Sequence, residues 1–130
     1  MGYAFSYNHS LPYSFVGLQS IFLATFQNPI YWNTACLIVN SGATDEEAGG
    51  STDYGKIAKA IGDIISAGIK VSLPDVNKSD FGFKPDVENN QILFGLKGML
   101  NVGDDVIMEI LNNRPYKSPK DFLNKVKPGK

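Results

Sequence analysis

The sequence predicts a mainly helical α+β fold, and three observations lead to that class. Apolar residues recur at spacings of three and four in three segments, residues 12–27, 29–40 and 53–67. Short β-branched and aromatic runs follow, separated by turn residues. A tight turn at Asn101-Val102-Gly103 then joins two apolar segments. In chain order we expect an N-terminal helical hairpin, a third helix, a small β-hairpin and a helix-hairpin-helix motif.

Composition limits the function classes. The 130 residues are 43% hydrophobic with a formal net charge of −1, which indicates a soluble globular chain with room for one ordinary core. A single cysteine, Cys36, and a single histidine, His9, give little material for a zinc enzyme or a Ser-His-Asp hydrolase. We therefore expect no catalytic residue, no metal ligand and no cofactor site in this chain.

Charge is unevenly distributed along the sequence. Residues 1–43 contain no Asp, Glu, Lys or Arg but hold nine of the fifteen aromatic residues. In residues 114–130, by contrast, nearly all the charged residues are Lys or Arg. Polar residues interrupt the apolar stretches of the first segment too often for a membrane span of about 20 residues. We expect its helices to be buried against each other and against further protein surface, and the isolated chain to self-associate through that surface.

Local signals place the element ends. Pro12 is typical of a first helical turn, Asn28-Pro29 separates two helices, and Gly68 ends the third. A strand is expected at residues 69–73 before Pro74, and a hairpin from residues 81–83 and 92–94 around a turn at residues 88–90. Ser118-Pro119 predicts the start of a short final helix.

The segment from Gly95 to Arg114 carries a binding signal. A glycine with positive φ in such a hairpin leaves backbone N–H groups beside a helix N-terminus, where a DNA phosphate can bind without regard to sequence. Lys97 and Arg114 are the nearby cations, whereas Asp104 and Asp105 would repel a phosphate. Two interpretations stay open here, a DNA contact and a purely structural turn. Unless the hairpin meets DNA, Arg114 is typical of a surface charge or a charge at a helix C-terminus.

His9 also has two interpretations. A lone histidine in aromatic surroundings is commonly a hydrogen-bonded core residue, and it can also serve a functional site. Asn8 and Ser10 beside it offer polar partners.

Four separated motifs stand in a recognisable order. They are Phe5-Ser6-Tyr7-Asn8-His9-Ser10 with Tyr13; Asn28-Pro29 with Trp32 and Ala35; Gly68-Ile69-Lys70-Val71-Ser72-Leu73-Pro74-Asp75-Val76-Asn77-Lys78-Ser79; and Ile92-Leu93-Phe94-Gly95-Leu96 followed by Val102-Gly103, Ile110, Arg114 and Asp121-Phe122. This series resembles the fingers region of the bacterial DNA polymerase III α subunits, the C-family replicative polymerases, over almost the whole chain. Its first segment resembles a phage member or one from a divergent bacterial lineage. Tyr7 stands where that family has a lysine, and Asn101 where its hairpin has a first glycine.

The resemblance implies a fragment of a DNA-directed DNA polymerase, a nucleotidyltransferase. Residues 1–67 would be the helical part of the fingers, and residues 68–130 a small β element plus a helix-hairpin-helix module. The implied nucleotide-binding residues are Phe5, Tyr7, Asn8, His9 and Tyr13, and the implied DNA-binding residues are Lys97, Gly98, Asn101, Val102, Gly103 and Arg114.

The same resemblance implies partners and a place of action. The partners would be a primer-template, a dNTP and the remaining polymerase domains, in the cytoplasm of a bacterial or phage-infected cell and with no membrane. Mg²⁺ would bind in a palm domain elsewhere, so the isolated chain should be inactive. Two alternatives are a stand-alone phage DNA-binding module and a module that binds a replication protein, both without polymerase activity.

Overall fold

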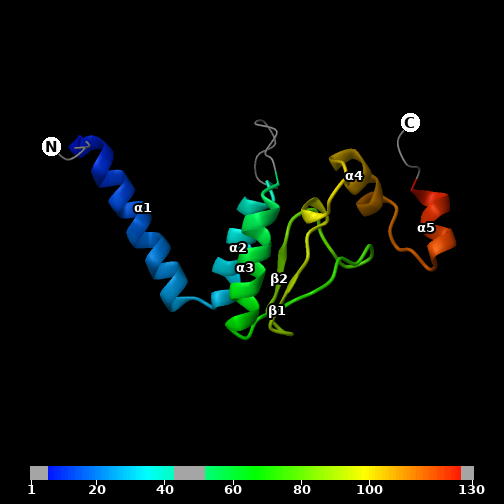
Figure 1. Cartoon of the computed structure of the whole chain (residues 1–130), viewed down its shortest axis with the longest axis horizontal. Helices are drawn as coiled ribbons and strands as arrows, with labels where there is room; N and C mark the ends of the chain where they lie inside the picture. Colours follow the sequence, from blue (N-terminus) through cyan, green and yellow to red (C-terminus); the bar gives the residue numbers. More distant parts are fainter. Residues whose placement is uncertain (1–5, 43–51, 127–130) are drawn as a thin grey trace.

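A computed structural model describes residues 6–42 and 52–126, and the predicted mainly helical α+β class is confirmed. The described part of the chain contains five α-helices, one 3-10 turn and a three-stranded sheet. Figure 1 shows an elongated arrangement in which α1 lies at one end, α5 at the other and the sheet between them.

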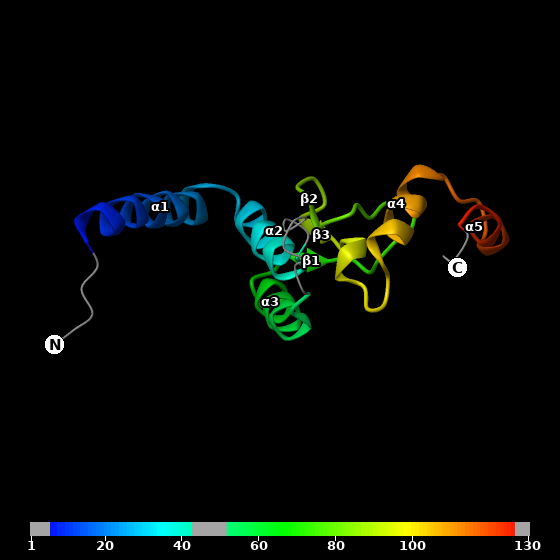
Figure 2. The same ribbon diagram turned by 90° about the horizontal axis from the view of Figure 1, so that it is seen from above.

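Helix α1 (Tyr7–Phe26) differs from the prediction in two ways. It begins five residues before Pro12, which lies inside the helix. There Pro12 removes only the hydrogen bond to the carbonyl of Asn8, in a turn exposed to water. The expected burial of this helix against its neighbour is wrong, because α1 has no buried residue. Figures 1 and 2 show α1 projecting away from the rest of the chain.

Helices α2 (Pro29–Asn40) and α3 (Tyr54–Ser66) pack against each other, and both begin at a side-chain cap. The Asn28 side chain accepts from the N–H of Ile30, and the Asp53 carboxylate accepts from the N–H of Lys56. Gly68, at φ +83°, follows the end of α3 as predicted. The two helices form one wall of the first hydrophobic core, whose buried members are Ile30, Leu37, Ile57, Ile64, Ile69, Phe83 and Ile92.

The sheet combines the predicted strand and the predicted hairpin. Strand β1 (Lys70–Val71) pairs in parallel with β3 (Gln91–Leu93), and β2 (Lys84–Asp86) pairs with β3 in antiparallel orientation. The first hairpin strand therefore lies three residues beyond the predicted 81–83. Pro85 is accommodated because β2 is an edge strand. Residues 80–83 instead contact the segment that follows β3.

A second hydrophobic core lies beyond the sheet. Its buried members are Leu96, Ile107, Ile110, Tyr116 and Val126. It draws on the 3-10 turn η1 (Leu96–Gly98), helix α4 (Asp104–Asn112) and the residue after helix α5 (Pro119–Lys125). Residues before and after position 67 both contribute to the first core. The division into residues 1–67 and 68–130 stays a prediction.

Gly95 lies where the two cores meet. A Cβ added to it would stand 2.4 Å from the carbonyl carbon of Gly82 and 2.5 Å from the backbone nitrogen of Phe83. Beside this contact, Leu96 N–H donates to the Asp80 carbonyl and Lys97 N–H to the Phe81 carbonyl, each at 2.9 Å. Backbone thus packs directly on backbone at this point.

This contact generates a stability prediction. Gly95→Ala should lower the free energy of unfolding by about 1–3 kcal/mol, because the added methyl overpacks rigid backbone. The matched control is Gly62→Ala inside α3, where an added Cβ meets nothing within 4 Å. That change should raise stability by about 0.5–1 kcal/mol. Urea unfolding measures both, and equal effects would contradict the assigned contact.

Candidate nucleic-acid interface

The predicted helix-hairpin-helix consists of η1, the turn at residues 99–103 and α4. Its first arm is fixed by the two backbone hydrogen bonds from Leu96 and Lys97. Gly98 is buried under aromatic rings, since an added Cβ would lie 3.0 Å from Phe94 and 3.3 Å from Phe83. Gly98 therefore has a packing role, and no outward-facing surface at this position is available to a ligand.

The turn reaches its tight conformation through Asn101 rather than through a glycine. Asn101 has φ +61°, while Gly103 has φ −75°, a value that any residue adopts. The expectation of a positive-φ glycine in this turn is thus wrong for Gly103. Asparagine is one of the few side chains that enter the left-handed region readily. Val102 packs against the second core, and Asn101 and Gly103 face solvent.

Lys97 and Asp104 form an ion pair near the start of α4. Lys97 Nζ lies 2.5 Å from Asp104 Oδ1, and the Lys97 side chain is 19% exposed against 58% for Asp104. Asp104 and Asp105 both lie in the first turn of α4, where carboxylates complement the helix dipole. Gly103 precedes that turn and provides no side-chain cap. An incoming phosphate would therefore meet uncapped first-turn N–H groups and a lysine already paired to a carboxylate.

Arg114 makes contacts that its sequence position did not suggest. Its Nε donates to the Val76 carbonyl at 2.6 Å, and its Nη2 donates to the Ser79 carbonyl. The guanidinium therefore fastens the turn at residues 75–79 to the end of α4. A DNA contact by Arg114 stays a prediction, and two of its donors are already used within the protein.

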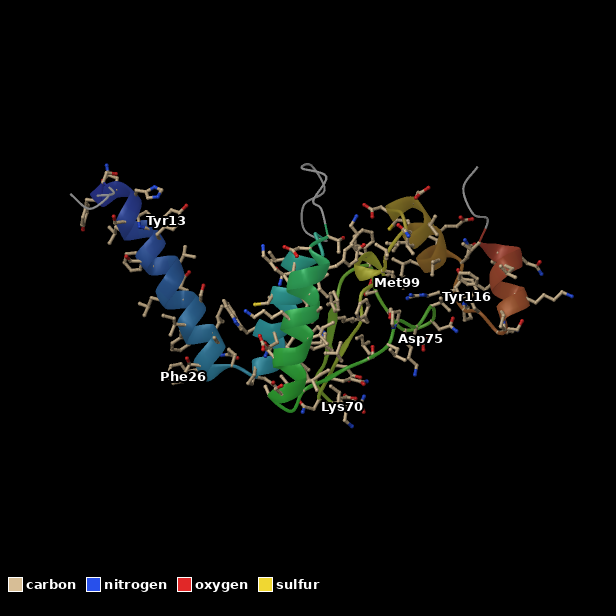
Figure 3. All side chains as sticks on the ribbon, viewed as in Figure 1. Tyr13, Phe26, Lys70, Asp75, Met99 and Tyr116 are labelled. Atoms are coloured by element: carbon tan, nitrogen blue, oxygen red, sulfur yellow. The ribbon has the colours of Figure 1, made fainter. Side chains whose placement is uncertain are left out.

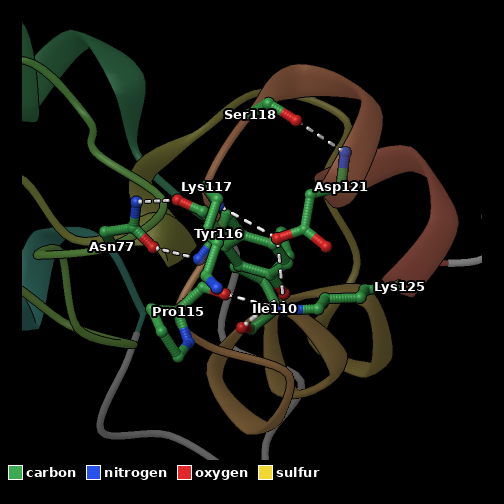
Figure 4. Close-up of polar contacts among 8 residues, drawn as sticks. All are labelled: Asn77, Ile110, Pro115, Tyr116, Lys117, Ser118, Asp121 and Lys125. Atoms are coloured by element: carbon green, nitrogen blue, oxygen red, sulfur yellow. Dashed lines mark hydrogen bonds and ion pairs between the residues drawn. The ribbon is translucent and has the colours of Figure 1, made fainter.

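Asn77 and Tyr116 form a second fastening between the same segments. Asn77 Nδ2 donates to the Tyr116 carbonyl at 2.9 Å, and Tyr116 N–H donates to Asn77 Oδ1 at 2.8 Å (Figure 4). The Tyr116 hydroxyl donates to the Ile110 carbonyl, and burial raises the pKa of this phenol. No local sequence pattern indicates this pair, because the two residues are 39 positions apart.

Helix α5 begins as predicted. Ser118 Oγ accepts from Asp121 N–H at 3.1 Å, and Pro119 occupies the first turn. Asp121 in turn accepts from the N–H of Lys117 at 2.9 Å and lies 3.2 Å from Lys125 Nζ. The backbone hydrogen bond from Lys117, aided by Lys125, holds the pKa of Asp121 below its ordinary value of 3.8.

Four of the five residues predicted to contact a nucleotide lie on α1. Tyr7 and Tyr13 are 75% and 68% exposed, Asn8 and His9 are exposed too, and Phe5 lies outside the described residues. His9 and Tyr13 rings stack with centroids 4.5 Å apart. The alternative of a buried core histidine is wrong for His9. Figures 1 and 3 show the start of α1, near Tyr13, far from the hairpin near Met99. The structure thus does not bring the two predicted sets of residues together.

Residues 6–42 and 52–126 contain neither a cluster of metal-binding side chains nor a membrane-spanning helix. Within these ranges no three His, Cys, Asp or Glu side chains are grouped so that they could hold a metal ion. No helix in the same ranges is long and apolar enough to cross a membrane.

The turn geometry can be tested at Asn101. Asn101→Ala should lower the free energy of unfolding by about 1 kcal/mol, because alanine disfavours the left-handed conformation. Asn101→Gly should preserve or raise it, because glycine adopts positive φ freely. Thermal and urea unfolding of both variants measure the difference. If alanine and glycine proved equally stable here, the positive φ at this position would be refuted.

The contribution of Asp121 to the free energy of unfolding should depend on pH. Its pKa is lowered in the folded state, so its contribution to stability is present above the ordinary pKa and disappears as pH falls through the lowered value. Urea unfolding of the wild type and Asp121→Asn should therefore differ most above about pH 4 and converge below it. A difference that stays constant across this range would contradict the ionised role of Asp121.

Comparison with known proteins places this geometry in a family. Residues 68–130 match the family model described as a helix-hairpin-helix motif. The chain is 53% identical, over 96% of its length, to the probable DNA polymerase YorL of Bacillus subtilis and to the DNA-directed DNA polymerase of Bacillus phage SPbeta. It is 34% identical, over 95% of its length, to the DNA polymerase III subunit alpha of Thermus aquaticus.

The match covers nearly all of this chain but only a small part of each relative. The aligned region is 10% of the Bacillus and phage polymerases and 9% of the Thermus subunit, so the chain spans about a tenth of the length of these relatives. The predicted resemblance is confirmed across nearly the whole sequence. The chain therefore belongs with the DNA polymerase III alpha subunits and the related Bacillus and phage DNA polymerases, and its second half carries a helix-hairpin-helix motif.

Proposed function

We propose that this chain is the fingers and helix-hairpin-helix segment of a replicative DNA polymerase III α-type subunit, and that its hairpin holds the DNA backbone during template-directed synthesis. The observation that carries the proposal is the first turn of α4, which Gly103 leaves without a side-chain cap and beside which Lys97 lies. Helix N-termini bind phosphate through such N–H groups and through the helix dipole. The match of residues 68–130 to the helix-hairpin-helix family supports it.

DNA binding by this hairpin would be independent of sequence. Phosphate contacts position a protein on DNA and carry no base information. The second half also has a favourable charge balance: residues 68–130 contain ten Lys and Arg against eight Asp and Glu, whereas residues 1–67 contain two against five. Residues 68–130 as a whole are thus the part of this chain better suited to an anionic partner.

The proposed role of α1 is contact with the rest of the polymerase. Its apolar side chains lie all around the helix and stay exposed, including Phe15, Leu18 and Phe26 at 58–70%. A helix that is apolar on every side is ordinarily buried in a larger core. We assign the remaining polymerase domains to this surface. In the isolated chain the same surface would drive self-association.

The first turns of α1 would face the incoming nucleotide. Phe5, Tyr7, Asn8, His9 and Tyr13 are the residues proposed for that contact, and the exposure of the last four leaves them accessible. Chemistry would depend on two Mg²⁺ ions in a palm domain elsewhere in the longer polymerase, in the cytoplasm of a bacterial or phage-infected cell.

A second candidate function is a module that docks on a replication protein through the aromatic N-terminal helices. The specific observation in its favour is the exposure of Tyr31 and Trp32, at 50% and 39%, beside the end of α1. This function predicts no DNA affinity at the hairpin, so one salt-dependence experiment separates it from the polymerase proposal.

The test is binding of the chain to a fluorescent duplex DNA across a series of salt concentrations. Lys97→Gln should weaken binding for every sequence and reduce the slope of log K against log salt by about 1. Asp104→Asn should strengthen binding, because it frees Lys97 and removes a repulsive charge. Lys59→Gln, an exposed lysine on α3, is the matched control.

The outcomes are distinct. A Lys97→Gln variant that behaves like Lys59→Gln would remove the hairpin from the DNA contact. Fluorescence anisotropy reads the affinity, and circular dichroism shows whether each variant keeps its helices.

A further inference from the structure

A groove at the C-terminal end of the fold has no part in the proposed polymerase function. It has a volume of about 470 Å³ and lies between the turn at residues 75–79 and α5. Its lining is mainly apolar and comes from three segments, with these principal residues: Val76, Asn77, Tyr116, Pro119, Phe122 and Leu123. The walls are held in place, because Asn77 and Tyr116 are joined by the two hydrogen bonds of Figure 4.

One wall carries an apolar side chain without cover. Leu123 is 70% exposed on α5, next to the half-buried Phe122. A rigid apolar groove bordered by an exposed leucine is suited to a single inserted apolar side chain, the anchor type that dominates small interfaces.

One lysine lines the groove, and two more adjoin its lining residues in the sequence. Lys117 lines it, Lys120 follows on α5, and Lys78 follows Asn77 in the turn; all three are exposed, and no ion pair of theirs occurs among the described residues. The acidic groups nearby are already engaged. Asp121 is bound by Lys117 N–H and Lys125, and Asp75 accepts from Asn77 N–H. The rim therefore attracts carboxylates or phosphates.

The groove is better suited to a peptide than to a nucleic-acid strand. Single strands bind by stacking their bases on open aromatic faces. Tyr116 offers no such face, since the residue is 7% exposed, its ring contacts Phe122 edge-on, and Lys125 Nζ lies 5.5 Å from the ring centroid. Val76, Pro119 and Leu123 instead present aliphatic edges.

We propose that this groove binds a short acidic peptide segment of another protein, with an apolar anchor side chain seated against Phe122 and Leu123 and flanking carboxylates on Lys117 and Lys120. The site is separate from the hairpin and does not rest on the proposed DNA contact. The groove would thus be a protein-docking site, distinct from the DNA contact proposed for the hairpin.

The experiment is selection of binders to the 130-residue chain from a random seven-residue peptide library. The enriched consensus should combine one large apolar residue with two or more acidic residues. The synthetic consensus peptide, labelled with a fluorophore, is then titrated by anisotropy. Leu123→Glu should weaken its binding about tenfold or more, because a charge replaces the apolar wall. Lys117→Glu should also weaken it, by reversing the rim charge.

Two controls separate the groove from other effects. Leu73→Glu, at a position 86% exposed outside the groove, should change peptide affinity less than about twofold. Lys97→Gln should leave peptide binding unchanged, which distinguishes this site from the hairpin.

Three results would overturn the proposal. They are the absence of an acidic-apolar consensus, a consensus peptide insensitive to Leu123→Glu, and competition by a labelled twelve-residue oligothymidine whose binding depends on Leu123. The last result would assign the groove to nucleic acid.

Discussion

The close approach of two backbone segments at Gly95 is the constraint on which the second half of this chain depends. Any side chain there would overlap the backbone at residues 82–83, which cannot move aside as a flexible side chain can. Phe83 belongs to the first core and Phe81 packs against the second, so this crossing separates the two cores. The direction in which the chain leaves it decides where the hairpin points.

A second set of contacts holds the far arm of the hairpin. Arg114 and Asn77 tie the segment after α4 to the turn at residues 75–79, and Ser79, 1% exposed, stabilises that turn by accepting from Asp75 N–H. The first arm is fixed at Gly95 and the second at Asn77. The hairpin is thus restrained at both ends, as the proposed contact of several N–H groups with one phosphate would require.

Features set by short-range patterns were predictable from the sequence, and those set by distant partners were not. The helix break at Asn28-Pro29, the cap at Ser118 and the ends of α2 depend on residues within three positions, so local rules located them. Arg114 and Asn77 acquire their partners across 35 to 39 positions, and nothing in the local sequence identifies such a pair. The strand shift to residues 84–86 has the same origin. The crossing at Gly95 uses the backbone of residues 80–83, which local patterning had assigned to a strand.

The ion pair between Lys97 and Asp104 bears on how a polymerase would use this hairpin. A replicative polymerase must hold DNA and still advance along it, so each phosphate contact must be broken at every step. A lysine that exchanges a phosphate for a neighbouring carboxylate keeps a partner in both states, which lowers the free-energy cost of release relative to a bare cation. The exchange also weakens binding, so the hairpin alone would have a low affinity for DNA. Most of the affinity would come from the rest of the polymerase. Under the proposed function, Asp104 would set how easily the hairpin releases DNA, and its position in the first turn of α4 would serve that release while it complements the helix dipole.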